Sequence, residues 1–294
     1  MILQNNLLEL ATYVSLVFAF VSFWLVGDRK FPLGFFVLSI LFALISNQIG
    51  LLALLPIALV AISLYYFYQI KQSSWIKFIL FLVIVITAIL LFVHKLPGYN
   101  NWLTLPNLKL SENSADFDFW INFDKPIIGF LLLLIAYQPI RKWTDCHKMF
   151  SEGFWIFVVA IITLLTFGMI TSYLVFDPKL PDAKFLSLWF IKMLFFTVIV
   201  EELFFRFFIQ NNIVGLLVKL KYSKIIGLVL TSFLFGLCHL PAGIIFAALA
   251  FISGLLYGGT YLRTNRLEAA ILLHFTVNFI HLICFSYPSY KLVL

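Results

Sequence analysis

The chain has 294 residues, of which 63% are hydrophobic and only 11% are charged. Soluble domains carry about 25% charged residues, so this composition excludes an ordinary soluble fold and indicates a chain embedded in the lipid bilayer. The formal net charge is +7, yet no basic run is interleaved with aromatic residues. Nucleic acid is therefore not expected as a partner, and the basic residues are interpreted as signals of membrane orientation.

Apolar segments follow one another along the chain, and each is interpreted as a helix because a crossing needs about 20 apolar residues. In chain order they span residues 7–26, 32–45, 51–68, 75–93, 126–140, 154–176, 185–218, 225–240, 243–262 and 267–287. The second is short enough to be re-entrant, and the seventh is long enough for its beginning to lie along the membrane interface. The sequence predicts an all-α fold, that of a polytopic integral membrane protein of about ten transmembrane helices.

Loop charges predict how these helices are oriented. One alternating set of loops carries twelve basic residues, whereas the opposite set, with the C-terminal tail, carries six basic residues among six acidic ones. Because basic residues collect on the cytoplasmic side, both termini are expected outside the cytoplasm. The longest polar connection, residues 95–125, is then expected to face outward as well.

The stretch "FFTVIVEELFFRFFIQ", residues 195–210, places Glu201, Glu202 and Arg206 within one apolar span. An ionisable side chain at the bilayer centre costs about 2.5–3.5 kcal/mol on insertion scales, unless it is paired or hydrated. Glu202 and Arg206 are four residues apart, so a helix places them on one face as a neutralising pair. Glu201 lies about 100° around that helix. Its carboxyl group is expected to be desolvated or bonded to another helix, which suits a general base, although a purely structural polar cluster is the alternative.

Two later spans carry further polar residues. "FGLCHLPAG" places His239 near a helix end that Pro241 disturbs, and "HFTVNFIH" places His274 and Asn278 on one helical face. A lone histidine inside a membrane is most often a hydrogen-bonded packing residue. Three polar spans together nevertheless supply a carboxylate, two imidazoles, a carboxamide and a Glu–Arg pair. This set of groups is sufficient to activate water and to stabilise an oxyanion.

These three stretches also match known motifs, in order along the chain. "EELFFR" fits EExxxR, "FGLCH" fits FxxxH, and "HFTVN" fits HxxxN. The ordered trio resembles the CAAX prenyl endopeptidase type II and bacteriocin-processing (CPBP) family of intramembrane proteases, over residues 185–287. "NFDKPIIG" at residues 122–129 also looks like bacterial members. We therefore expect residues 1–150 to be N-terminal transmembrane helices of unknown role and residues 151–294 to be the protease core.

The resemblance implies a role for each motif residue. Glu201 corresponds to the general base that activates water, and His239 helps to hold that water. His274 and Asn278 correspond to the groups that face the oxyanion. Glu202 and Arg206 correspond to a supporting pair. The implied function is an intramembrane endopeptidase that hydrolyses a peptide bond of a peptide or protein substrate in or near the membrane. The implied location is a bacterial plasma membrane.

Cofactor use and two rival functions stay open at this point. No cofactor is favoured, because the sequence lacks HExxH. A divalent metal such as Zn is the alternative, held by Glu201, His239 and His274 with one open position. One rival function is an ion-coupled transporter, since buried Glu, His and Arg clusters also form proton relays. The other is a non-catalytic CPBP-like protein that binds a membrane partner.

Overall fold

The computed structural model describes residues 2–71 and 75–290, and a helix occurs in each of the ten apolar segments. The helices are α1 (Ile2–Leu25), α2 (Lys30–Ile45), α3 (Leu54–Gln69), α4 (Trp75–Phe92), α5 (Asp124–Ile135), α6 (Trp143–Ile170), α7 (Ala183–Ile191), α8 (Ile199–Glu202), α9 (Asn211–Leu216), α10 (Ser223–Cys238), α11 (Ile244–Thr264) and α12 (Leu267–Cys284). Within the described residues, seven helical segments are long and apolar enough to cross a membrane, which identifies an integral membrane protein. Ten crossings remain a prediction, because α2, α5 and α10 have only 16, 12 and 16 residues.

The all-α fold is confirmed, and the structure adds one small element that was not predicted. The connection 95–125 contains a two-stranded sheet, formed by β1 (Trp102–Leu108) and β2 (Phe117–Ile121). Apolar and aromatic residues dominate both strands, and Pro106 is tolerated in β1 because neither strand of a two-stranded sheet has a second neighbour. A second difference is that α6 begins at Trp143 rather than at residue 154, so its first turns include polar residues that a hydropathy reading leaves out.

The described part of the chain forms two compact units. The first takes in the residues up to 104, together with 120–139 and 195–200. The second takes in 105–119, 140–194 and the residues from 201 onward. The predicted division at residue 150 separates segments by expected role rather than by compactness, and it stays a prediction.

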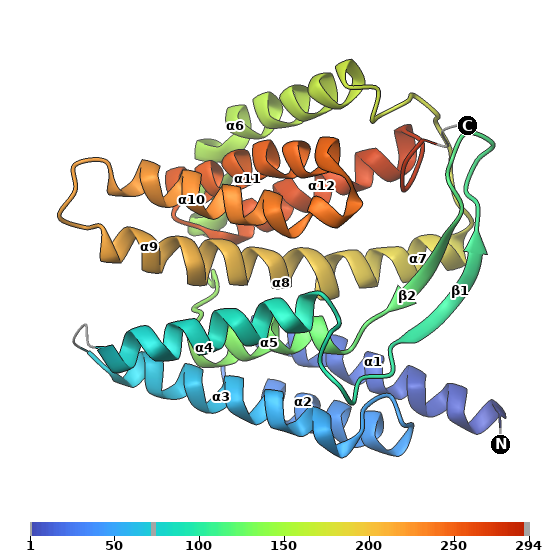
Figure 1. The fold of residues 1–294 in the computed structure, drawn as a ribbon, viewed down its shortest axis with the longest axis vertical. Helices are drawn as coiled ribbons and strands as arrows, with labels where there is room; N and C mark the ends of the chain where they lie inside the picture. Colours follow the sequence, from blue (N-terminus) through green and yellow to red (C-terminus); the bar gives the residue numbers. More distant parts are fainter. Residues whose placement is uncertain (1, 72–74, 291–294) are drawn as a thin grey trace. The chain divides into compact units, whose positions relative to one another are not determined.

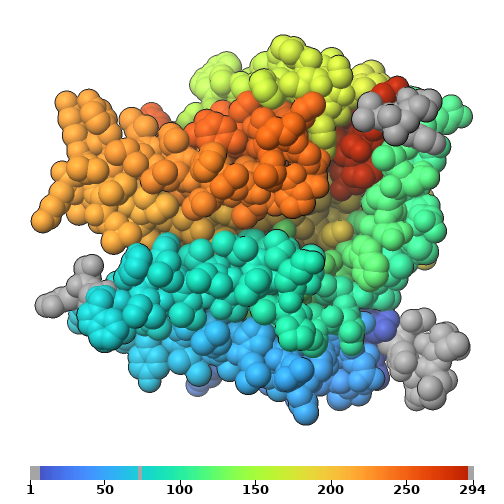
Figure 2. Space-filling view, viewed as in Figure 1, coloured from blue at the N-terminus to red at the C-terminus, as the bar shows by residue number. Residues whose placement is uncertain are grey.

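The first unit contains α1 to α5. In Figure 1, α1 lies along α2, and α5 lies beside α3 and α4. Its core is aromatic: the Phe130 ring stacks on Phe36 at 4.5 Å between centroids and meets Phe20 edge-on at 5.4 Å. Figure 2 shows the side chains of α3 and α4 packed side by side on one face. Exposed apolar residues such as Phe78 and Ile86 on α4 suit contact with lipid.

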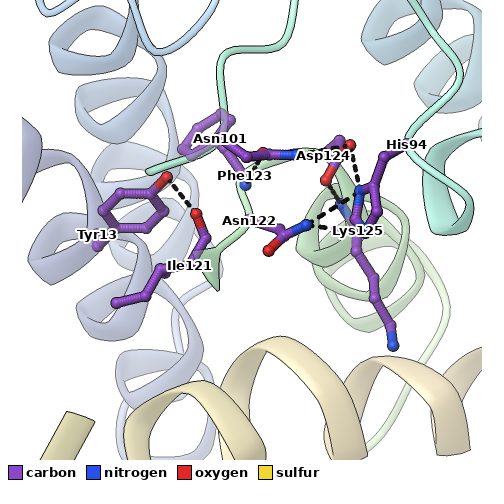
Figure 3. A network of polar contacts seen from close by, with 8 residues as sticks. All are labelled: Tyr13, His94, Asn101, Ile121, Asn122, Phe123, Asp124 and Lys125. Carbon is purple, nitrogen blue, oxygen red and sulfur yellow. Dashed lines mark hydrogen bonds and ion pairs between the residues drawn. The ribbon is translucent and has the colours of Figure 1, made fainter. Parts of the chain in front are cut away.

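A polar network holds the beginning of α5 in this unit (Figure 3). The Asp124 carboxylate is 1% exposed, and its Oδ2 atom accepts a hydrogen bond from His94 Nδ1 at 2.7 Å. Asn101 Nδ2 donates to the same oxygen at 3.3 Å, while Asn101 Oδ1 accepts from the Phe123 backbone N–H at 3.0 Å. Asn122 Nδ2 lies 2.8 Å from His94 Nε2. The first three residues of the stretch "NFDKPIIG" therefore anchor the N-terminal end of α5.

Replacing Asp124 by alanine is expected to lower the thermal midpoint of the detergent-solubilised protein. The change removes an acceptor that two side chains share, and the net loss of a hydrogen bond costs about 0.5–1.5 kcal/mol. Scanning fluorimetry measures the midpoint. The exposed Asp116 provides the control, since Asp116→Ala is expected to leave the midpoint unchanged. Equal midpoints for both variants would contradict the anchoring role.

The second unit contains α6 to α12, except for residues 195–200. Its central helix, α11, packs against α10, α6 and α12 (Figure 1). Small residues allow close approach: a Cβ atom on Gly236 of α10 would lie 2.9 Å from the Ala247 carbonyl oxygen. A Cβ atom on Gly254 of α11 would lie 3.0 Å from Ser232. Small residues at helix contacts are the usual packing device in membranes, where water supplies no hydrophobic force between helices.

Candidate active site

The helical run from residue 183 to residue 216 is not a regular α-helix. π-helical segments at Lys192–Val198 and Leu203–Gln210 flank the short α8. π-helical turns are rare and occur mostly at functional sites, because they widen the helix and redirect the side chains. Glu201 and Glu202 lie at the C-terminal end of α8, between the two π-helical segments. The motif carboxylates thus occupy the most irregular stretch of this helix.

Glu202 is the centre of the polar cluster. One of its carboxylate oxygens, Oε1, accepts a hydrogen bond from His274 Nδ1 at 2.9 Å, and the other, Oε2, accepts one from Arg206 Nε at 3.1 Å. The Glu202 and Arg206 side chains are both 0% exposed. The pair predicted from four-residue spacing is therefore present, despite the π-helical backbone. The bond from His274, which comes from α12, was not predicted.

Glu201 faces the other side of the same imidazole. Its Oε2 atom lies 3.9 Å from His274 Nε2, and the two side chains are only 7% and 6% exposed. This separation is too long for a direct hydrogen bond, but a polar contact beyond 3.5 Å is often bridged by water. Because Nδ1 donates to Glu202, the Nε2 atom of His274 is the one directed at Glu201. The carboxylates of Glu201 and Glu202 thus face the two different ring nitrogens of His274.

His239 joins the cluster through the Phe235 ring. His239 Nδ1 donates to the Phe235 carbonyl oxygen at 2.7 Å, a bond that leaves Nε2 available as an acceptor. The Phe235 ring lies 4.6 Å from the His239 ring and 6.1 Å from the His274 ring, between centroids. The Arg206 guanidinium carbon lies 5.1 Å from the centroid of the same ring, within cation–π range. Residues from both histidine motifs therefore meet at one aromatic side chain.

Asn278 has a different neighbour. Its Nδ2 atom lies 3.3 Å from the Met193 Sδ atom, and the side chain is half-buried, one helical turn beyond His274. The structure places Asn278 on the helix of His274, in contact with the π-helical segment before Glu201. A role facing the oxyanion stays a prediction for this residue.

The alternative metal site is not assembled in this structure. Within residues 2–71 and 75–290, no group of three or more His, Cys, Asp or Glu side chains has a geometry that could hold a metal ion. The donor set Glu201, His239 and His274 is therefore not gathered around one point. The Nδ1 atoms of the two histidines bond to Glu202 and to the Phe235 carbonyl, which leaves Nε2 as the nitrogen that could ligate a metal.

Sequence reasoning missed two residues that the structure brings to the cluster. Tyr257 stacks on His274, and Gln210 is fully buried one turn beyond Arg206, where its Nε2 atom donates to the Gly258 carbonyl at 3.3 Å. Gln210 had a usable signal, since it continues the four-residue spacing of Glu202 and Arg206. Tyr257 had none, because a tyrosine in an apolar span is ordinarily a packing or interfacial residue.

The fold and the cluster together define a class: a polytopic membrane protein with a buried acid–imidazole cluster in its C-terminal half. A family model described as type II CAAX prenyl endopeptidase Rce1-like matches residues 183–280. The chain thus carries an Rce1-like domain over this range, which includes all residues of the EExxxR, FxxxH and HxxxN motifs. No curated protein and no solved structure matches the chain.

Proposed function

We propose that the protein is an intramembrane endopeptidase that hydrolyses a peptide bond with water activated by Glu201. The observation that carries the proposal is the buried juxtaposition of Glu201 Oε2 and His274 Nε2 at 3.9 Å, with Glu202 bonded behind the imidazole. A gap of this size fits a water molecule or a substrate oxygen. The family match over residues 183–280 supports the same reaction class.

The residues divide the reaction between them. Glu201 takes a proton from water while the water oxygen forms a bond to the scissile carbonyl carbon, and the proton then passes to the leaving amine as the C–N bond breaks. His239, whose Nε2 atom is available as an acceptor, helps to hold that water. When protonated, His274 offers an Nε2–H donor to the oxyanion, and Asn278 is the second proposed donor. Glu202 and Arg206 fix His274 and balance charge.

The substrate and the cellular setting belong to the same proposal. The substrate is a peptide or protein at the membrane, and the protein resides in a bacterial plasma membrane with both termini outside the cytoplasm. The twelve basic residues of one loop set support this orientation. Cysteine accessibility at both ends of the chain, in cells and in inverted vesicles, tests it.

The test uses purified protein in proteoliposomes with internally quenched CAAX peptides, one prenylated and one not. Glu201→Gln is expected to reduce kcat/KM at least about 100-fold, since a positioned general base contributes about 10²–10⁴-fold. His274→Gln and His239→Gln are expected to reduce it similarly, with unchanged expression. Glu152→Gln is the matched control, because Glu152 makes a partly exposed ion pair with Lys148 outside the cluster.

Two further measurements separate the rival functions. Cleavage in excess chelator, with metal content measured alongside, distinguishes chemistry carried by the side chains alone from metal-dependent hydrolysis. Proton flux across the same vesicles reports on transport. Normal cleavage by the Glu201→Gln variant would overturn the proposed mechanism, and flux without cleavage would replace the protease with a transporter.

A further inference from the structure

Tyr257 lies on α11, a helix that carries none of the motif residues, yet it forms one wall of the cluster. Its ring lies 4.5 Å from the His274 ring between centroids, with only 19° between the two planes. The side chain is 2% exposed. A stacked aromatic neighbour at this distance is a specific contact rather than loose packing.

We propose that Tyr257 is a positioning residue that sets the plane of the His274 imidazole, an inference that rests on the proposed function. The bond from His274 Nδ1 to Glu202 fixes one direction in the ring plane. Rotation about the Cβ–Cγ bond would move Nδ1 off Glu202 and swing Nε2 away from Glu201, and one hydrogen bond of modest net strength opposes it. A flat surface against the imidazole face opposes the same rotation.

A second aromatic ring restrains the imidazole from another side. The Phe235 ring approaches the imidazole at 6.1 Å with an interplanar angle of 90°, so it limits rotation from another direction. The imidazole is therefore constrained by one in-plane bond, one stacked face and one edge-on ring.

The position of α11 makes the stacking ring rigid. Tyr257 belongs to a buried cluster with Ala160 and Leu164 of α6 and with Ala270 and Leu273 of α12. One turn earlier, Gly254 lies so close to Ser232 of α10 that a Cβ atom would come within 3.0 Å. The Tyr257 ring on α11 is packed against α6 and α12, so it is a rigid support for the His274 ring that stacks on it. A leucine at this position would fill space but would present no planar face.

The experiment compares two substitutions at Tyr257 with one at Tyr261, a tyrosine one turn further along the same helix. Tyr257→Phe keeps the stacked ring, and Tyr257→Leu removes it. Tyr261→Leu is the control, because Tyr261 contacts Asn211 through its hydroxyl group at 2.8 Å. The assay is cleavage of the quenched CAAX peptides in proteoliposomes, with kcat and KM determined separately and thermal midpoints recorded.

Tyr257→Leu is expected to lower kcat about 10- to 100-fold with little change in KM, since small misplacements of a reacting group have effects of this order. Tyr257→Phe is expected to retain most of the wild-type kcat, and Tyr261→Leu all of it. A Tyr257→Leu variant with wild-type kcat would overturn the proposal. So would equal loss in the Phe and Leu variants, which would assign the effect to the hydroxyl group.

A second readout does not depend on cleavage. In histidine-labelled protein, NMR resolves the ring protons of the five histidines, and a stacked tyrosine shifts those of His274 upfield. This shift is expected in the wild type and in Tyr257→Phe, and it is expected to vanish in Tyr257→Met, an unbranched substitution chosen to preserve folding. An unchanged shift in Tyr257→Met would refute the stack. Activity in the Glu201→Gln variant tests the proposed function separately, so the two failures are distinguishable.

Discussion

Replacing Glu202 by glutamine is expected to abolish cleavage and to destabilise the protein at the same time. Glu202 is the common acceptor for His274 Nδ1 and Arg206 Nε. Without the negative charge of Glu202, the fully buried Arg206 has lost the counter-charge of its ion pair. Removing one partner of a buried ion pair costs about 3–5 kcal/mol, because the desolvated charge that remains has no counter-charge.

Arg206 has few other contacts that could compensate for the loss of the Glu202 carboxylate. Its Nη1 and Nη2 atoms have no hydrogen-bond partner among the described residues, and its remaining favourable contact is with the Phe235 ring. The cation–π interaction contributes about 2 kcal/mol even when desolvated, which does not replace a carboxylate. Glu201→Gln differs in this respect, because it leaves the Glu202–Arg206 ion pair in place. It is expected to lose activity while keeping its thermal midpoint.

A double variant separates the two effects of Glu202. Glu202→Gln with Arg206→Met removes both charges, and replacing a whole buried pair is often neutral for stability. The double variant is expected to recover most of the thermal midpoint lost in Glu202→Gln, but none of the activity, because the glutamine amide gives His274 no negative charge to stabilise its protonated form. Recovery of cleavage in the double variant would show that Glu202 acts only through Arg206. An unchanged midpoint in the single variant would show that the pair contributes little to stability.

Local spacing predicted the parts of the site that lie on one helix. The Glu202–Arg206 pair followed from a separation of four residues, which keeps two side chains on one face even where the backbone becomes π-helical. Composition likewise predicted the membrane helices, because about 20 apolar residues in succession have few other stable states. Both inferences depend on short stretches of sequence.

Tertiary contacts explain what the sequence did not reveal. Nothing in residues 201–202 indicates which glutamate His274 contacts, and the structure shows that it contacts both, through different ring nitrogens. The stack of Tyr257 on His274 joins α11 to α12 and has no local signature. The sheet in the 95–125 connection was missed because hydropathy alone does not separate a short apolar strand from an interfacial anchor.

Gly129→Ala is expected to disturb both stability and activity, and it tests the packing of the helix that leads to Glu201. Gly129 lies on α5, where a Cβ atom would come within 2.7 Å of Val200 Cγ2, 2.8 Å of its Cα and 2.9 Å of its Cβ. Real Cβ atoms essentially never approach so closely, and one of the three atoms belongs to the backbone. Repacking side chains alone cannot relieve the clash, so one helix must shift. Overpacking of this kind typically costs about 1–3 kcal/mol.

The effect on activity follows from connectivity. Val200 immediately precedes Glu201 in α8, so a shift of the backbone at Val200 moves the proposed general base. A displacement near 1 Å is able to reduce turnover by about 100-fold. We therefore expect Gly129→Ala to lower kcat by about 10- to 100-fold and to lower the thermal midpoint.

Two companion variants make this result specific to the Gly129–Val200 contact. Gly34→Ala is the matched control: Gly34 also lies in an apolar helix, but a Cβ atom there would meet nothing within 4 Å. It is expected to be neutral or stabilising by up to about 1 kcal/mol, from helix propensity alone. Val200→Ala combined with Gly129→Ala removes the Cγ2 clash but leaves the clashes with Cα and Cβ, so it should restore kcat only in part. Full activity in Gly129→Ala alone would mean that the contact between Gly129 and Val200 does not set the position of Glu201.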